Sequence, residues 1–157
     1  FSLRKNYAAA FIDGKEAVLV SDLNREDKNY TFSVEPALSQ LQVDKIHFIK
    51  LKKDTFLKRF VSNNNQIAFF QYKMLLIGDD LNDKEINGNA RFSSIWVSGN
   101  TKFNLGKIHP DIKYKTAIID ATNKDHKIRI FKKEFENNNI DVYVLKKNKA
   151  YLVQLSQ

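Results

Sequence analysis

The chain has 157 residues, of which 43% are hydrophobic and 28% are charged, and its formal net charge is +8. This length and composition predict one folded domain, residues 1–157, with a sizeable hydrophobic core. No apolar run approaches the ~18 residues that a membrane-spanning helix needs, and no signal peptide is recognisable. The absence of cysteine excludes disulfides, thiolate metal sites and cysteine nucleophiles.

Alternating apolar residues and turn signals predict mostly strands in the first half of the chain. Residues 7–22 form a predicted hairpin with a type I′ turn at Asp13-Gly14. Residues 32–43 predict a short helix, with Ser33 as a candidate N-cap and Pro36 in the first turn. Three further segments follow: 45–51 as an alternating strand, 54–65 as either a strand or a short helix ending at Asn63, and 66–80 as two strands around Tyr72-Lys73.

The second half predicts strands on both sides of one long helix. A polar loop precedes a buried strand that starts at Ser93, and a short helical stretch is expected near 104–110. Residues 115–122 predict another buried strand. The helix spans 123–139, with Ile128, Phe131 and Phe135 at helical spacing, a capping box of Thr122 with Asp125, and a closing hairpin beyond it that turns at Lys147-Asn148. The fold class is therefore α/β or α+β.

The strand that starts at Ser93 ends abruptly in the turn Ser98-Gly99-Asn100. Ligands of α/β proteins usually bind at the carboxyl ends of strands, so this turn stands where a site is expected. It offers no usual metal ligand, no general base, and no nucleophile except Ser98. No G-x-S-x-G elbow, P-loop or dinucleotide fingerprint occurs elsewhere in the chain.

Candidate metal ligands are few. Zinc hydrolases need three or four converging ligands, and the only histidines, His47, His109 and His126, do not fall at the close spacing that lets one element present a pair. Asp22, Asp79 and Asp80 follow buried strands, where carboxylates either bind Mg²⁺ through water or cap turns.

Asp120 ends an apolar run that leads into the predicted helix. Burying a carboxylate is costly unless backbone NH groups or a cation pair with it. We expect Asp120 to organise the turn into the helix, with catalysis as the alternative role.

The net charge, from 26 Lys and Arg against 18 Asp and Glu, suits an anionic partner such as nucleic acid or a membrane surface. The codon bias of an AT-rich genome is the alternative origin of the many Lys. Basic and aromatic residues mix in residues 50–60, where they either follow a phosphate backbone and stack on bases or form a solvated basic face with Phe in the core. The candidate DNA contacts are Lys50, Lys52, Lys53, Lys58 and Arg59.

Several segments, in order, resemble the C-terminal domain of ComEC-type competence proteins in the form found in Bacteroidetes. They are NYAAAFIDGKEAVLVSD, FQYKMLLIGDD, IWVSGN, AIIDATNKDHKIRIFKKEF and IDVYVLKKNKAYLVQL. The resemblance implies a metallo-β-lactamase-like α/β fold, in which two β-sheets are flanked by helices. It also implies a parent protein in the inner membrane, with a channel and an OB-fold domain, that takes up transforming DNA as a single strand. In members with a full active site, this domain resembles a metal-dependent nuclease.

The sequence departs from the catalytic version of that family. A His-x-His-x-Asp-His motif is missing, and Gly99-Asn100 follow Val97-Ser98 where the family has a histidine pair. The resemblance therefore implies a degenerate, shortened fold without a metal or other cofactor. Its vestigial site positions are Ser98, Gly99, Asn100, Asp120 and His126.

We therefore expect a non-catalytic soluble domain excised from a ComEC-like channel protein, which scaffolds the channel or guides DNA by charge. Its expected partners are DNA and the channel and OB-fold domains of the same parent chain, and its expected location is the periplasmic side of the inner membrane. The alternatives are a nuclease that uses Mg²⁺ or Mn²⁺ at Asp22, Asp79, Asp80 or Asp120 with His126, and a protein-interaction domain with an exposed aromatic patch.

Overall fold

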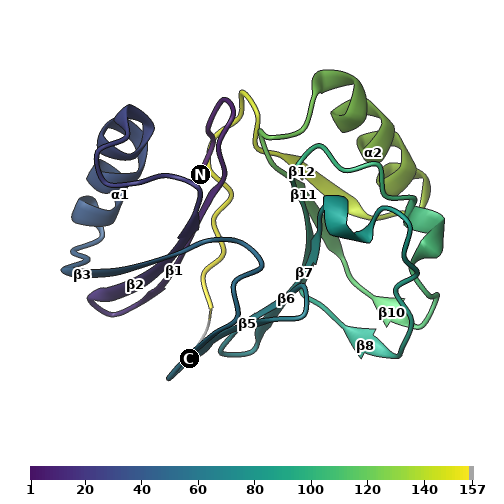
Figure 1. Ribbon diagram of the computed structural model, residues 1–157, viewed down its shortest axis with the longest axis horizontal. Coiled ribbons are helices and arrows are strands. Elements are labelled where there is room, and N and C mark those ends of the chain that lie inside the picture. The colour runs from purple at the N-terminus through teal and green to yellow at the C-terminus, as the bar shows by residue number, and fades with distance from the viewer. Residues whose placement is uncertain (156–157) are drawn as a thin grey trace.

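A computed structural model describes residues 1–155 as two β-sheets that face each other between helices (Figure 1). The first sheet has the strand order β1 (Ala8–Asp13), β2 (Glu16–Ser21), β3 (Lys45–Ile49), with β1 antiparallel and β3 parallel to β2. The π-helical turn η1 (Tyr30–Val34) and the helix α1 (Glu35–Gln40) connect β2 to β3. Parallel strands require such a crossover.

The predicted hairpin at residues 7–22 is confirmed, but its turn type is wrong. Asp13 pairs with Glu16, so the two-residue loop is Gly14-Lys15, and of these two residues only Gly14 has a positive φ, of 58°. A type I′ turn needs positive φ at both positions, whereas glycine at the first position is typical of type II′. The predicted cap is also wrong, because Ser33 lies inside η1, while Pro36 does occupy the first turn of α1.

The second sheet has seven strands in the order β12-β11-β9-β7-β6-β5-β4. Strands β4 to β7 form an antiparallel meander, and β7, β9, β11 and β12 run parallel. The strand bounds are β4 (Thr55–Leu57), β5 (Phe60–Asn63), β6 (Gln66–Phe69), β7 (Tyr72–Ile77), β9 (Ser94–Val97), β11 (Thr116–Ile119) and β12 (Asp141–Val144).

Three predictions in this sheet need correction. Residues 54–65 form two strands, joined at Lys58-Arg59. Phe69 pairs with Tyr72, so the β6–β7 turn lies two residues before the predicted Tyr72-Lys73. The chain does turn after β12, but residues 149–155 add no strand; Tyr151 and Leu155 instead pack against the core between the sheets.

The long helix is confirmed as α2 (Asp125–Asn137), with Ile128, Phe131 and Phe135 buried. The predicted strands at 45–51 and 115–122 and the one starting at Ser93 are confirmed as β3, β11 and β9. The helical stretch expected near 104–110 is the short helix η3 (Leu105–Lys107). The remaining elements are η2 (Asp79–Leu81) and a parallel ribbon of β8 (Ala90–Arg91) with β10 (Ile112–Lys113).

Three apolar cores hold these layers together. Phe11, Val18 and Val20 of the first sheet meet side chains of the second sheet such as Phe60 and Trp96. Outside this central core, one cluster joins α1 and η1 to the first sheet and another joins α2 to the second. The predicted α/β class, with two sheets between helices, is confirmed. No helix within residues 1–155 is long and apolar enough to span a membrane.

Candidate functional site

The carboxyl ends of β7, β9 and β11 lie side by side at one edge of the second sheet. Ile77, Val97 and Ile119 are in register as the last residues of these strands. The loops that follow begin at Gly78, Ser98 and Asp120. The predicted positions at the ends of these strands are therefore brought together, at the edge where α/β proteins commonly bind ligands.

The turn Ser98-Gly99-Asn100 holds the start of helix α2. Gly99 N–H donates to the Thr122 hydroxyl oxygen at 2.7 Å, and Lys124 N–H donates to Asn100 Oδ1 at 3.0 Å. The first N–H groups of a helix lack partners within the helix, and Asn100 supplies one from another loop. The predicted capping box of Thr122 with Asp125 is wrong, because Lys124 is the N-cap of α2 and makes no side-chain cap.

Asp120 is 1% exposed and is surrounded by hydrogen-bond donors. Trp96 Nε1 donates to its Oδ2 at 2.9 Å, Thr122 N–H donates to Oδ1 at 3.0 Å, and Asn123 Nδ2 donates to Oδ1 at 3.2 Å. The Thr122 hydroxyl also donates to Oδ1. Burial raises the pKa of Asp120, and these donors oppose the shift. Oδ1 holds the turn between β11 and α2, which is the structural role expected for Asp120, and Oδ2 ties this turn to Trp96 of β9.

Lys52 bridges the two carboxylates that follow β7. Its Nζ lies 2.8 Å from Asp79 Oδ1 and 2.7 Å from Asp80 Oδ1, and Asn65 Nδ2 donates to Asp80 Oδ2 at 2.9 Å. Although desolvation opposes it, hydrogen bonding to the two carboxylates raises the pKa of Lys52. The Lys52 hydrogen bond lowers the pKa of Asp79. One ammonium group therefore pairs with both carboxylates that were candidate Mg²⁺ ligands and offsets one of their two negative charges.

Glycine at position 78 makes room for this bridge. A Cβ atom added to Gly78 would lie 2.7 Å from Lys52 Nζ and 2.8 Å from Lys52 Cε. Contacts this short do not occur for real side chains, so any other residue would displace the end of Lys52.

The remaining candidate ligands lie apart from this cluster. Asp22 follows β2 in the first sheet, where it accepts hydrogen bonds from Asn6 Nδ2 at 3.1 Å and Tyr7 N–H at 3.0 Å. The Tyr7 ring meets Trp96 edge-on, with centroids 5.9 Å apart. His126 is exposed in the first turn of α2.

These residues do not fit a catalytic metal centre. Among residues 1–155 no group of three or more His, Asp or Glu side chains gathers as a metal site would require. Two-metal cleavage needs acidic ligands that bridge ions, but both oxygens of Asp120 accept hydrogen bonds, and one oxygen each of Asp79 and Asp80 pairs with Lys52.

The five candidate DNA contacts are exposed on the β3–β4 connection and the β4–β5 turn, but two of them have protein partners. Lys52 binds Asp79 and Asp80, and Arg59 Nη1 lies 2.6 Å from Asp13 Oδ2, with its guanidinium group 4.9 Å from the centre of the Phe70 ring. The two phenylalanines of the segment differ: Phe60 is 1% exposed and belongs to the core, whereas Phe56 is 67% exposed.

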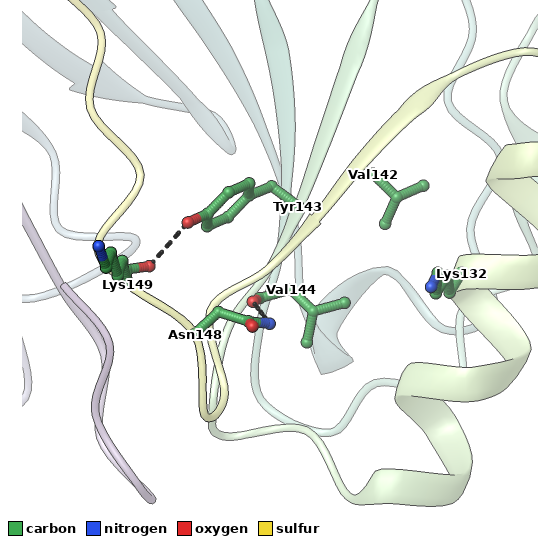
Figure 2. A pocket seen from close by; sticks show the side chains of 6 residues that line it. All are labelled: Lys132, Val142, Tyr143, Val144, Asn148 and Lys149. Carbon is green, nitrogen blue, oxygen red and sulfur yellow. Dashed lines mark hydrogen bonds between the residues drawn. The ribbon is translucent and has the colours of Figure 1, made fainter.

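A shallow hollow of about 410 Å³ lies beside β12, the edge strand of the second sheet, and Figure 2 shows the side chains that line it. Asn148 Nδ2 donates to the Val144 carbonyl at 2.7 Å, and the Tyr143 hydroxyl donates to the Lys149 carbonyl at 3.0 Å. The lining contains two lysines but no histidine or carboxylate, so it offers no acid–base pair for catalysis. It consists of Lys132, Val142, Tyr143, Val144, Asn148 and Lys149.

The sequence analysis missed the partners that define these contacts. Trp96 and Asp120 are 24 positions apart, as are Asn100 and Lys124, and Lys52 and Asp79 are 27 apart. No local pattern pairs residues at such separations. The only signal in the sequence was that these residues follow predicted buried strands, and a place at a strand end does not specify a bond.

Comparison with known proteins identifies the family. The family model described as the ComEC C-terminal domain matches residues 1–155. Neither a search of curated proteins nor a search of solved structures gave a match. Because the match extends over nearly the whole chain, the protein belongs to the family of ComEC C-terminal domains, and this membership indicates a role in DNA uptake during competence.

Proposed function

We propose that this domain supports the uptake of single-stranded DNA across a membrane without catalysing a reaction itself. Membership of the ComEC C-terminal domain family supports a part in DNA uptake. The contacts in the loops after β7, β9 and β11 support the lack of catalysis. The single observation that carries the proposal is that the polar groups at this edge bind one another: donors from the fold engage Asp120, and Lys52 pairs with both Asp79 and Asp80.

The domain acts either as a scaffold for the channel or as a basic guide for DNA. The net charge of +8 supports guidance, because an excess of Lys and Arg attracts a polyanion at long range. The proposed partners are DNA and the channel and OB-fold domains of a parent protein in the inner membrane, with this domain on the periplasmic side.

Binding to labelled single-stranded and double-stranded DNA, measured at several salt concentrations, tests guidance. A basic guide releases counterions from DNA, so its affinity should fall as salt rises. A protein with no detectable affinity at low salt would contradict guidance and leave the scaffold role.

A cleavage assay with Mg²⁺ or Mn²⁺ tests the lack of catalysis. We expect no cleavage of either DNA form above a metal-only control. Cleavage that Asp120→Asn abolishes while the variant remains folded would overturn the proposal in favour of a nuclease.

A further inference from the structure

Within residues 1–155, part of the outer face of the second sheet has no covering layer. Near β11 and β12 this face is covered by α2 (Figure 1), and Leu75, Ile77 and Ile95 lie in the core beneath. The meander β4 to β7 extends beyond that core, and its outward residues are solvent-accessible to different degrees. We call these residues the outer meander face: Phe56, Val61, Asn63, Gln66, Ala68 and Lys73.

The strand register orders this face. Phe56 pairs with Val61, Val61 with Ala68, and Ala68 with Lys73, so these four residues form one row across four strands. Paired residues in antiparallel strands point to the same side of a sheet. The row therefore runs from an aromatic ring at the sheet edge to an ammonium group.

The face combines three kinds of chemistry. Phe56 is 67% exposed at the sheet edge. Beside the row lies a shallow hollow of about 250 Å³, lined by residues that include Asn63 and Gln66. Asn63 Oδ1 is buried without a hydrogen-bond partner, so this amide gains if it turns to meet a donor. Lys73 is exposed, and none of the six residues of the face is acidic.

We propose that the outer meander face binds single-stranded DNA through its bases. Stacking on exposed aromatic rings and ammonium contacts to phosphates are the two general means of binding single strands. Phe56 supplies the ring and Lys73 the cation, the exposed amide of Gln66 meets base edges, and the amide of Asn63 does so once it turns outward. This inference rests on the proposed function and extends the guiding surface from Phe56, which lies in the segment 50–60, across the sheet to Lys73.

The face favours nucleic acid over a protein partner by its charge. An exposed ring at one end of the row and a lysine at the other, on a chain of net charge +8, suit a polyanion whose bases can stack. Single strands fit better than duplexes, because the bases of a duplex are stacked on one another and cannot lie against Phe56.

Fluorescence anisotropy with a labelled single-stranded oligonucleotide of about 15 nucleotides, the upper range of known site sizes, tests the proposal. Phe56→Ala should weaken binding about fivefold or more, as the loss of one stacked base does. Lys73→Ala should weaken binding and lower the slope of log affinity against log salt by about one.

Two matched controls lie on other faces. Phe32 is 77% exposed in η1, and Lys133 is exposed in α2, so Phe32→Ala and Lys133→Ala remove the same side-chain types elsewhere. Both controls should bind like the unaltered protein. Circular dichroism establishes that all four variants are folded.

The outcomes separate this inference from the proposed function. If the unaltered protein binds no single strand at low salt, DNA guidance fails and this inference fails with it. If it binds, but Phe56→Ala and Lys73→Ala bind as the controls do, only the outer meander face is wrong. If the chain is dimeric in sedimentation and Phe56→Ala makes it monomeric, the face is a contact between two copies, and the inference is overturned.

Discussion

The ammonium group of Lys52 lies 2.8 Å from the carboxylate of Asp79 and joins the chain after β3 to the chain after β7. The contact ties the β3–β4 connection, which passes from the first sheet to the second, to the edge where a ligand would be expected. The same ammonium group also lies 2.7 Å from the carboxylate of Asp80. Lys52 thus places a positive charge between Asp79 and Asp80, where a metal ion bound by these carboxylates would otherwise lie.

Replacing Lys52 should destabilise the protein modestly. Lys52→Met removes the ammonium group but keeps most of the aliphatic stem. Because the three side chains are partly exposed and screened by solvent, we expect a loss of about 1 kcal/mol in the free energy of unfolding. Urea denaturation measures it, with Lys53→Met at a nearby exposed position as the control. A variant as stable as the control would show that the bridge contributes nothing.

The same contribution should depend on pH in a defined window. The pKa values of Asp79 and Asp80 are lowered, although burial opposes the shift at Asp80. The stabilisation by the bridge is therefore present above the ordinary pKa of 3.8 and is lost as pH falls through the lowered values. The raised pKa of Lys52 keeps the stabilisation complete below the ordinary value of 10.5, and it is lost as pH rises through the raised value. The difference in unfolding free energy between the unaltered protein and Lys52→Met should therefore be constant in between and disappear in acid.

Gly78→Ala should act through Lys52. The new methyl group would lie 2.7 Å from Lys52 Nζ, and the flexible end of the lysine would move away from its carboxylates. We expect a loss similar to that of Lys52→Met, and little further loss when both substitutions are combined. A double-mutant cycle by urea denaturation measures this coupling. Strictly additive losses would mean that Gly78 matters for another reason.

Asp120→Asn should be more damaging than an exposed Asp→Asn substitution. The amide keeps the size of the carboxyl group but cannot accept from every donor around it, since the NH₂ group faces either Trp96 or Thr122. An unpaired buried donor costs about 1–3 kcal/mol. Asp83→Asn, at an exposed position, is the control. Equal losses in the two variants would contradict the structural role of Asp120.

The pH profile of the Asp120→Asn variant gives a second readout. Burial raises the pKa of Asp120, so the folded protein holds its proton to higher pH than the unfolded chain does. The free energy of unfolding should therefore fall as pH rises from 3.8 through the raised pKa. The variant should lack this component, which thermal denaturation across the acidic range measures.

Asn100 should stabilise the protein as a cap that another loop provides for the start of α2. Asn100→Ala removes the acceptor for Lys124 N–H and places a Cβ-bearing residue without a polar side chain at a φ of 54°. We expect a loss of about 1–2 kcal/mol, whereas Asn100→Gly, which relieves the backbone, should cost less. Equal losses would show that only the hydrogen bond matters.

The sequence predicted the elements better than their ends. The period of Ile128, Phe131 and Phe135 identified α2, because burial on one helix face leaves that spacing. The β1–β2 turn was misplaced because Asp13-Gly14 is compatible with more than one hairpin register, and the pairing of Asp13 with Glu16 decides between them. The final hairpin was wrong because Tyr151 and Leu155 pack between the sheets, although their alternation resembles a strand.

The position of the candidate site was predictable from the sequence, but the hydrogen bonds within it were not. A strand ending in Ser98-Gly99-Asn100 and another ending in Asp120 predict a shared edge in any parallel sheet. Thr122 shows why the bonds were missed: it was expected to cap its own helix, but its hydroxyl group bonds to Asp120 and Gly99. That choice depends on the position of the β9 loop in space.

The layering of the molecule also sets an order of events during synthesis. The first sheet with α1 is contiguous in sequence and has its own small core around Leu19, Val34 and Leu38, so it is complete once residue 49 has emerged. Its opposite face, with Phe11 and Val20, stays bare until the meander is made. The nascent chain therefore passes through a stage in which this apolar surface is exposed to solvent. Premature release from the ribosome at that stage would favour aggregation.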